Sequence, residues 1–96
     1  MTKRELVSAI SAQTGEENQT TALILETFIE VVMEAVANDD SVTLRRFGVF
    51  ERKHHPKRPV RDVFNKVAVE LPAHNAPRFR PAKEFKRQVQ EQTQTA

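Results

Sequence analysis

One segment of this chain is too apolar for the rest of the chain to cover. From about Asn18 to Ala37, apolar residues recur at helical spacing and predict a long helix. A chain of 96 residues offers little to bury so broad a surface, so we expect a second copy of the chain to pack against it. The main stripe is Leu25, Phe28, Ile29, Val32 and Val36, which Ile24, Val31 and Met33 widen beyond one face.

A shorter helix is predicted before this segment. Thr2 and Glu5 form a capping box, and Gly15 is a natural residue for the helix C-terminus. Alternation then predicts one strand over 41–45 and the start of another over 47–51. Gly48 between two phenylalanines indicates a bend or a close approach of backbone.

The second half of the chain predicts a projecting ribbon and a last helix. Pro56 and Pro59 exclude central-strand pairing nearby, so residues 53–66 should project as an edge ribbon or loop. Residues 67–71 read as the returning strand, and 72–77 as a connection. Pro81 suits the first position of a final helix, which carries Phe85 and Val89 at i, i+4 spacing.

Charge is divided sharply along the sequence. Residues 1–44 carry two basic and eight acidic side chains, whereas residues 45–96 carry thirteen basic and five acidic ones. The densest stretch, Arg45 to Arg61, contains Glu51 as its only acid. A basic half in a nearly neutral protein predicts a polyanionic partner. A second cluster of Arg78, Arg80, Lys83, Lys86 and Arg87 lies at the start of the final helix, where backbone N–H groups also attract phosphate.

Catalytic and metal sites are not expected. No serine stands in a nucleophile context, no carboxylate cluster resembles a nuclease centre, and two glycines exclude a Gly-rich phosphate loop. Adjacent His54 and His55 point to opposite faces of a strand, and His74 is distant in sequence, so we expect surface or phosphate-contacting histidines without a metal or cofactor. With no cysteine and no apolar leader or span, a cytoplasmic location is expected.

Two motifs resemble a known family. Residues 46–50, Arg-Phe-Gly-Val-Phe, are similar to the Gly-Phe-Gly-x-Phe of the HU and integration-host-factor family of bacterial DNA-bending proteins. Residues 76–83, Ala-Pro-Arg-Phe-Arg-Pro-Ala-Lys, are similar to the family's Val-Pro-x-Phe-Lys-Pro-Gly-Lys. The two motifs also lie at the family's separation, and the resemblance extends from about Lys3 to Val89.

The resemblance implies an α+β fold that forms an intertwined homodimer. Each chain would be one domain over residues 1–96, in which 1–44 form the helical dimerisation base and about 52–70 form a β-ribbon arm. A three-stranded antiparallel sheet and a short C-terminal helix complete it, and the paired arms reach into the DNA minor groove. The candidate DNA-binding residues are Lys3, Arg46, Arg52, Lys53, His55, Lys57, Arg58, Arg61, Val63, Phe64, Lys66, Arg78, Arg80, Lys83 and Lys86.

The arm tip departs from the family pattern. Val63 stands where relatives carry an intercalating proline, Asp62 adds a charge that phosphates repel, and Asn65-Lys66 replace the usual Thr-Gly turn. Phe64 is larger and a better wedge, although strand alternation aims it oppositely. Two possibilities follow for the tip. Val63 or Phe64 inserts between base pairs and unstacks a base step, or neither inserts and the arms only follow the groove.

The sequence favours a non-specific architectural protein of the bacterial nucleoid that bends or compacts double-stranded DNA. Few Asn or Gln side chains lie on the arm to read base edges. Three alternatives stay open: a site-specific host-factor-like subunit with a non-identical partner, an RNA or single-strand binder, and a structural module for acidic protein partners. The single-strand alternative needs exposed aromatic platforms, whereas Phe28, Phe47, Phe50 and Phe79 are expected in the core.

Overall fold

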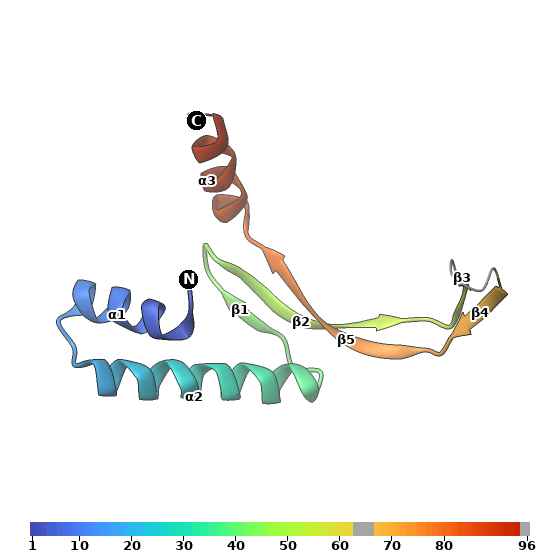
Figure 1. Ribbon diagram of the computed structural model, residues 1–96, viewed down its shortest axis with the longest axis horizontal. Helices are drawn as coiled ribbons and strands as arrows, with labels where there is room; N and C mark the ends of the chain where they lie inside the picture. The colour runs from blue at the N-terminus through green and yellow to red at the C-terminus, as the bar shows by residue number, and fades with distance from the viewer. Residues whose placement is uncertain (63–66, 95–96) are drawn as a thin grey trace. The chain divides into compact units, whose positions relative to one another are not determined.

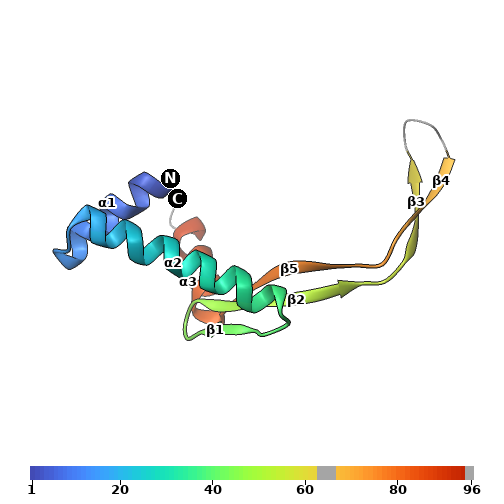
Figure 2. The same cartoon turned by 90° about the horizontal axis from the view of Figure 1, so that it is seen from below.

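A computed structural model describes residues 1–62 and 67–94, with side chains described for residues 1–59 and 71–92. The chain divides into two compact units, residues 1–34 and 35–96, and the division falls inside the second helix. Figure 1 traces the elements in chain order, and Figure 2 shows them after a quarter turn. They are α1 (Lys3–Thr14), α2 (Asn18–Ala37), β1 (Val42–Leu44), β2 (Gly48–His55), β3 (Arg58–Asp62), β4 (Val67–Leu71), β5 (His74–Pro81) and α3 (Lys83–Gln94).

Local capping groups fix both ends of α1. The Thr2 hydroxyl accepts a hydrogen bond from the Glu5 backbone N–H at 3.2 Å, and satisfies one of the donors left open at a helix N-terminus. Gly15 ends the helix in the left-handed conformation, with φ of 80°, and donates its N–H to the Ser11 carbonyl at 2.9 Å. Both predicted ends of this helix are confirmed.

Residues 1–34 pack around a small contact that combines an apolar and a polar side chain. Val7 and Thr21 are buried, and the Ser11 hydroxyl donates to the Thr21 hydroxyl at 3.0 Å, which joins α1 to α2. Along α2, residues Leu25, Phe28 and Val32 continue the same stripe as Thr21. Phe28 nevertheless keeps 40% of its surface exposed.

The main sheet has three antiparallel strands in the order β1-β2-β5. Thr43 of β1 lies opposite Val49 of β2, and Val49 lies opposite Arg80 of β5. The β2–β5 ladder is the longer one: it runs from Gly48 opposite Pro81 to His55 opposite His74. Antiparallel pairing between segments far apart in the sequence therefore organises this half of the chain.

A two-stranded ribbon of β3 and β4 follows β2 and precedes β5 (Figure 1). Arg58 lies opposite Leu71, and Asp62 opposite Val67. Pro59 is tolerated because every strand of a two-stranded ribbon has an unpaired edge. The predicted ribbon and the returning strand over 67–71 are confirmed within the described residues.

The predicted connection over 72–77 is wrong beyond Ala73, because β5 already begins at His74. Pro77 lies within this strand, opposite Arg52. β5 is an edge strand of the sheet, so the missing N–H of Pro77 costs no ladder hydrogen bond to a further strand.

The start of the last helix also differs from the prediction. Pro81 is the final residue of β5, and α3 begins at Lys83. The Ala82 N–H donates to the Phe47 carbonyl at 2.9 Å, and the Ala82 carbonyl accepts from the Lys86 N–H at 3.1 Å. Ala82 therefore occupies the N-cap position, two residues later than Pro81 at the first helical position would require.

Four phenylalanines form the apolar centre of residues 35–96. Phe47 lies 5.2 Å from Phe79 and 5.5 Å from Phe85 between ring centroids, and Phe50 lies 4.8 Å from Phe79. Phe47 and Phe79 are still 43% and 37% exposed. Among the described residues of the single chain, only Val7 and Val36 are apolar and buried. One chain alone therefore has very little core.

Candidate nucleic-acid interface

The β2–β5 ladder has two chemically different faces. Residues directly opposite each other share a face, and successive residues alternate. One face carries the paired Phe50 and Phe79, whose rings are part of the aromatic cluster. The opposite face, here called the cationic face, consists of Glu51, Lys53 and His55 of β2 with Arg80, Arg78 and His74 of β5.

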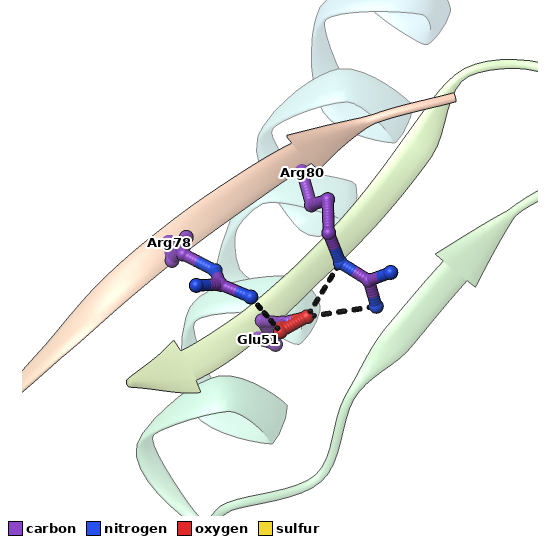
Figure 3. Close-up of polar contacts among 3 residues, drawn as sticks. All are labelled: Glu51, Arg78 and Arg80. Carbon is purple, nitrogen blue, oxygen red and sulfur yellow. Dashed lines mark hydrogen bonds and ion pairs between the residues drawn. The ribbon is translucent and has the colours of Figure 1, made fainter. Parts of the chain in front are cut away.

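Glu51 holds the two arginines of the cationic face (Figure 3). Its Oε2 accepts from Arg78 Nη2 at 3.2 Å, and its Oε1 accepts from Arg80 Nε at 3.2 Å and Nη2 at 3.1 Å. The hydrogen bond from Arg80, with the positive charges of Arg80 and Arg78, lowers the pKa of the Glu51 carboxyl despite partial desolvation. One anion therefore bridges two cations, and the trio keeps a net positive charge.

The far end of this face carries a pair of histidines. His55 and His74 are register partners, and their rings stack with centroids 4.9 Å apart at 15°. Strand pairing thus brings His74 beside His55 although the two are distant in sequence. His54 lies on the other face, and its Nδ1 is 3.0 Å from Asn75 Oδ1. The prediction that His54 and His55 point apart is confirmed.

Arg52 lies on the face opposite the cationic one. Its Nη1 donates to the Ala37 carbonyl at 3.3 Å, and its Nη2 lies 3.6 Å from Asp39 Oδ2. A cation next to the last carbonyls of a helix interacts favourably with the helix dipole. The side chain thus fastens β2 to the end of α2, a role that its place in a basic run did not reveal.

Arg46 connects the turn before β2 to α3. Its Nε lies 2.7 Å from Glu84 Oε2, and both side chains are largely solvent-exposed. The hydrogen bond from Arg46 and its positive charge lower the pKa of the Glu84 carboxyl. Arg46 has a positive φ of 75°, which is uncommon for a residue with a side chain. This candidate is therefore paired within the protein.

The other predicted cations lie in three places. Lys3 forms an ion pair of 2.6 Å with Glu26 inside residues 1–34. Lys83 and Lys86 lie exposed in the first turn of α3. Lys57 and Arg58 lie at the junction between β2 and β3, and the backbone of Arg61 pairs with Ala68. Val63, Phe64 and Lys66 lie outside the described residues.

Two classes of site lack support within the described part of the chain. No three histidine, cysteine, aspartate or glutamate side chains gather there in a way that could hold a metal ion. In the same residues, every helix is too short or too polar to traverse a bilayer.

Sequence reasoning did not identify the bridging role of Glu51 or the pairing of Arg46 with Glu84. The only signal for Glu51 was its isolation as the one acid of the basic stretch. Both contacts depend on which residues meet across the sheet or between sheet and helix, and that information is not local.

These features define a class of protein: an α+β fold with an antiparallel β-ribbon and a sheet face suited to a polyanion. The model of the family described as bacterial DNA-binding protein matches residues 1–90. The chain belongs to this family, and the resemblance to HU and integration host factor is confirmed.

Individual relatives support the same assignment. The chain is 30% identical over 89 residues to the DNA-binding protein HU of Thermotoga maritima, with 93% of this chain and 99% of that protein covered. It is 37% identical over 90 residues to the integration host factor subunit beta of Marinobacter nauticus, with 93% and 92% covered. Among solved structures, the Anabaena HU–DNA cocrystal structure matches with a TM-score of 0.86 at 32% identity, covering 93% of this chain and 97% of that one.

Proposed function

We propose that this protein is an architectural double-stranded-DNA-binding protein of the bacterial nucleoid. Two chains form an intertwined dimer, and the paired β-ribbon arms enter the minor groove and bend or compact DNA with little sequence specificity. The protein works without a cofactor and without catalysis. Phosphate neutralisation and groove shape supply the binding free energy.

One observation carries this proposal: the β2–β5 ladder places Lys53, Arg78 and Arg80 on a single face. Side chains that share one face of a sheet can contact successive phosphates of one strand of DNA. The Anabaena HU protein was cocrystallised with DNA, and its chain matches this one over nearly its whole length. Both observations point to the same polyanion.

The exposed apolar surface supports the dimer. Phe28 lies on the inward stripe of α2 but is 40% exposed, and Ile24 and Met33 are 61% and 66% exposed on the same helix. Contiguous apolar exposure of this kind marks an interaction surface. A second copy of the chain would bury the apolar side chains of α2 that one chain leaves exposed. Residues 1–44 then form the dimerisation base, and about 52–70 form the arm.

The remaining candidates would contact DNA at different places. We assign Arg52, Lys53, His55, Lys57, Arg58, Arg61 and Lys66 to the arm, with Val63 or Phe64 as the wedge at its tip. Lys3, Arg46, Arg78, Arg80, Lys83 and Lys86 would hold phosphates that flank it. Arg52 is the weakest of these candidates, because its guanidinium already contacts the end of α2.

A salt titration tests the proposal. Affinity for a short labelled random-sequence duplex should fall by roughly 10³–10⁵ between about 50 and 200 mM salt, because several counterions are released per dimer. Lys53→Gln should weaken binding to all sequences and reduce the salt slope by about 1 for each phosphate interaction that it removes. Arg4→Gln removes the same charge from α1, outside the assigned residues, and is the matched control. A flat salt response would contradict DNA binding and favour a module for acidic proteins.

The tip needs its own measurement. End-to-end fluorescence transfer on a doubly labelled duplex reports the bend angle for the native protein, Val63→Ala and Phe64→Ala. Loss of bending in one variant identifies the wedge, since unstacking a base step requires an apolar side chain of sufficient size. Unchanged bending in both variants would show that the arms only track the groove.

A second candidate function is site-specific bending as a host-factor-like subunit. It is favoured by the 37% identity to an integration host factor subunit beta. Selection of bound duplexes from a random library separates the two functions. A recovered consensus sequence would support the site-specific function, and a library that stays random would support the HU-like one.

A further inference from the structure

The stacked histidines stand at the last position of the β2–β5 ladder. After His55 the chain passes through Pro56 into β3, and before His74 it leaves β4 through Pro72. The two rings lie parallel within 15°, with their centroids 4.9 Å apart. Parallel stacking is favourable for neutral imidazoles, whereas two imidazolium rings at this separation repel each other.

The hydrogen bond of His74 determines which ring nitrogen can meet a ligand. Its Nδ1 lies 3.2 Å from the Pro72 carbonyl oxygen. A carbonyl can only accept, so Nδ1 carries a proton in both charge states of the ring. Nε2 is therefore the ring nitrogen left for a ligand, and it is an N–H donor when the ring carries both protons. The backbone thus orients His74 for this role.

Among the described side chains, the charged groups that act on His55 are positive or become so. They are Lys53 on the same face of β2, His74 across the ladder, Arg58 at the start of β3, and the neighbouring His54. Ala76, the other near residue of β5 on this face, is neutral. Desolvation first, and then these positive groups, lower the pKa of His55 below its ordinary value.

The nearest carboxylate on the same face is not available to His55. Glu51 lies four residues earlier on β2, and its two oxygens accept from Arg78 and Arg80. Within the described side chains of this face, the histidine pair therefore has positive neighbours and no anion of its own. An external anion is the group that would make its protonation favourable.

We propose that His55 and His74 form a proton-linked binding site for one DNA backbone phosphate on each arm. The neutral, stacked pair binds the phosphate weakly, and the protonated pair donates to it through ring N–H groups. Phosphate binding and proton uptake then reinforce each other, so DNA affinity rises as pH falls. The site rests on the proposed DNA-binding function and adds a pH dependence to it.

The test measures affinity for a random-sequence duplex at constant ionic strength from about pH 8 to about pH 5.5. Each proton taken up should tighten binding by up to about tenfold per pH unit through the range where the histidines titrate. Calorimetry in two buffers with different ionisation enthalpies then counts the protons. Uptake of protons on binding is expected near pH 6, and none at pH 8.

Three variants locate the effect. The double variant His55→Gln, His74→Gln should lose the pH dependence, so that its affinity falls further behind that of the native protein as pH is lowered. His54→Gln removes a histidine from the opposite face of the same strand and should keep it. In the native protein, an NMR titration should show the pKa of His55 rising when DNA is added, and this result decides the question if the double variant does not fold.

The outcomes separate the two proposals. A steep salt dependence at pH 8 together with an affinity that does not change with pH would overturn the histidine site and leave DNA binding intact. A pH dependence that survives in the double variant but disappears in His54→Gln would also overturn it. A flat salt response at pH 8 would overturn DNA binding itself.

Discussion

Arg80 donates from both Nε and Nη2 to a single oxygen of Glu51, at 3.2 and 3.1 Å. The contact orients the guanidinium on the cationic face and at the same time occupies its donors with an internal anion (Figure 3). A DNA phosphate that approaches Arg80 must therefore compete with Glu51. The carboxylate is a built-in competitor for the proposed ligand.

Replacing this carboxylate should strengthen DNA binding. In Glu51→Gln, Arg78 and Arg80 lose their internal partner, so we expect affinity for a random duplex to increase by about 2- to 10-fold and the salt slope to steepen. Fluorescence anisotropy across a salt series measures both. Glu16→Gln makes the same change of net charge in the segment before α2, and it therefore controls for the effect of net charge alone. Weaker binding by Glu51→Gln would mean that orientation of the arginines outweighs competition.

The Arg46–Glu84 pair predicts a loss of stability in acid. The pKa of Glu84 is lower in the folded protein than in the unfolded chain, so the unfolded chain binds more protons between the two values. The contribution of the pair is complete above about pH 4.3, the ordinary pKa of glutamate, and disappears as pH falls through the lower native value. The unfolding temperature of Glu84→Gln should differ slightly from that of the native protein at pH 7. The two unfolding temperatures should converge near pH 3. A constant difference at both pH values would rule out this linkage.

Gly48 should be intolerant of any side chain. A Cβ at this position would lie 2.6 Å from Phe79 Cε1 and 2.7 Å from the Arg80 backbone oxygen. Gly48→Ala should lower the free energy of unfolding by about 1–3 kcal/mol, as overpacking does, in urea denaturation. Gly15→Asn is the comparison, because Gly15 has open space and asparagine tolerates its left-handed backbone. Equal losses in both variants would contradict the close approach at Gly48.

A charge at Phe28 should prevent assembly. Phe28 is 40% exposed in one chain, so in a folded monomer Phe28→Asp would cost only part of the roughly 3–5 kcal/mol that truncation of a fully buried phenylalanine costs. In a dimer that covers this ring, the variant buries an unpaired carboxylate and should be unfolded or monomeric at concentrations where the native protein is dimeric. Sedimentation and circular dichroism measure both states, with Thr27→Asp on the exposed side of α2 as the control. A stable folded native monomer would contradict the intertwined dimer.

The helices could be predicted from sequence because their determinants are local. Thr2 and Gly15 define the ends of α1 within one turn of each end, and the apolar period defines α2 from Asn18 to Ala37. The start of β5 could not be predicted in the same way. Residues 72–77 have the composition of a turn, and residues 74–77 become part of a strand only because residues 52–55 of β2 offer partners.

The basic composition of the candidate site could be predicted from the sequence, but the arrangement of its side chains could not. The basic stretch indicated a polyanion, yet the strand register decides that Lys53 and Arg78 share a face while Arg52 turns toward Ala37. The same register brings His74 to His55 although the two are distant in sequence. Charge is a property of single residues, whereas a binding face is a property of paired strands.

The alternation along β2 has an evolutionary consequence. Phe50 and Glu51 are neighbours in sequence, but one side of the strand belongs to the aromatic cluster and the other to the cationic face. A substitution alters one side at one position and leaves the other unchanged. Insertion or deletion of a single residue would exchange the two sides downstream of it, exposing phenylalanine to DNA and burying lysine. We therefore expect lineages of this protein to accept substitutions on this strand that keep the chemistry of each side, while the number of residues in it stays fixed.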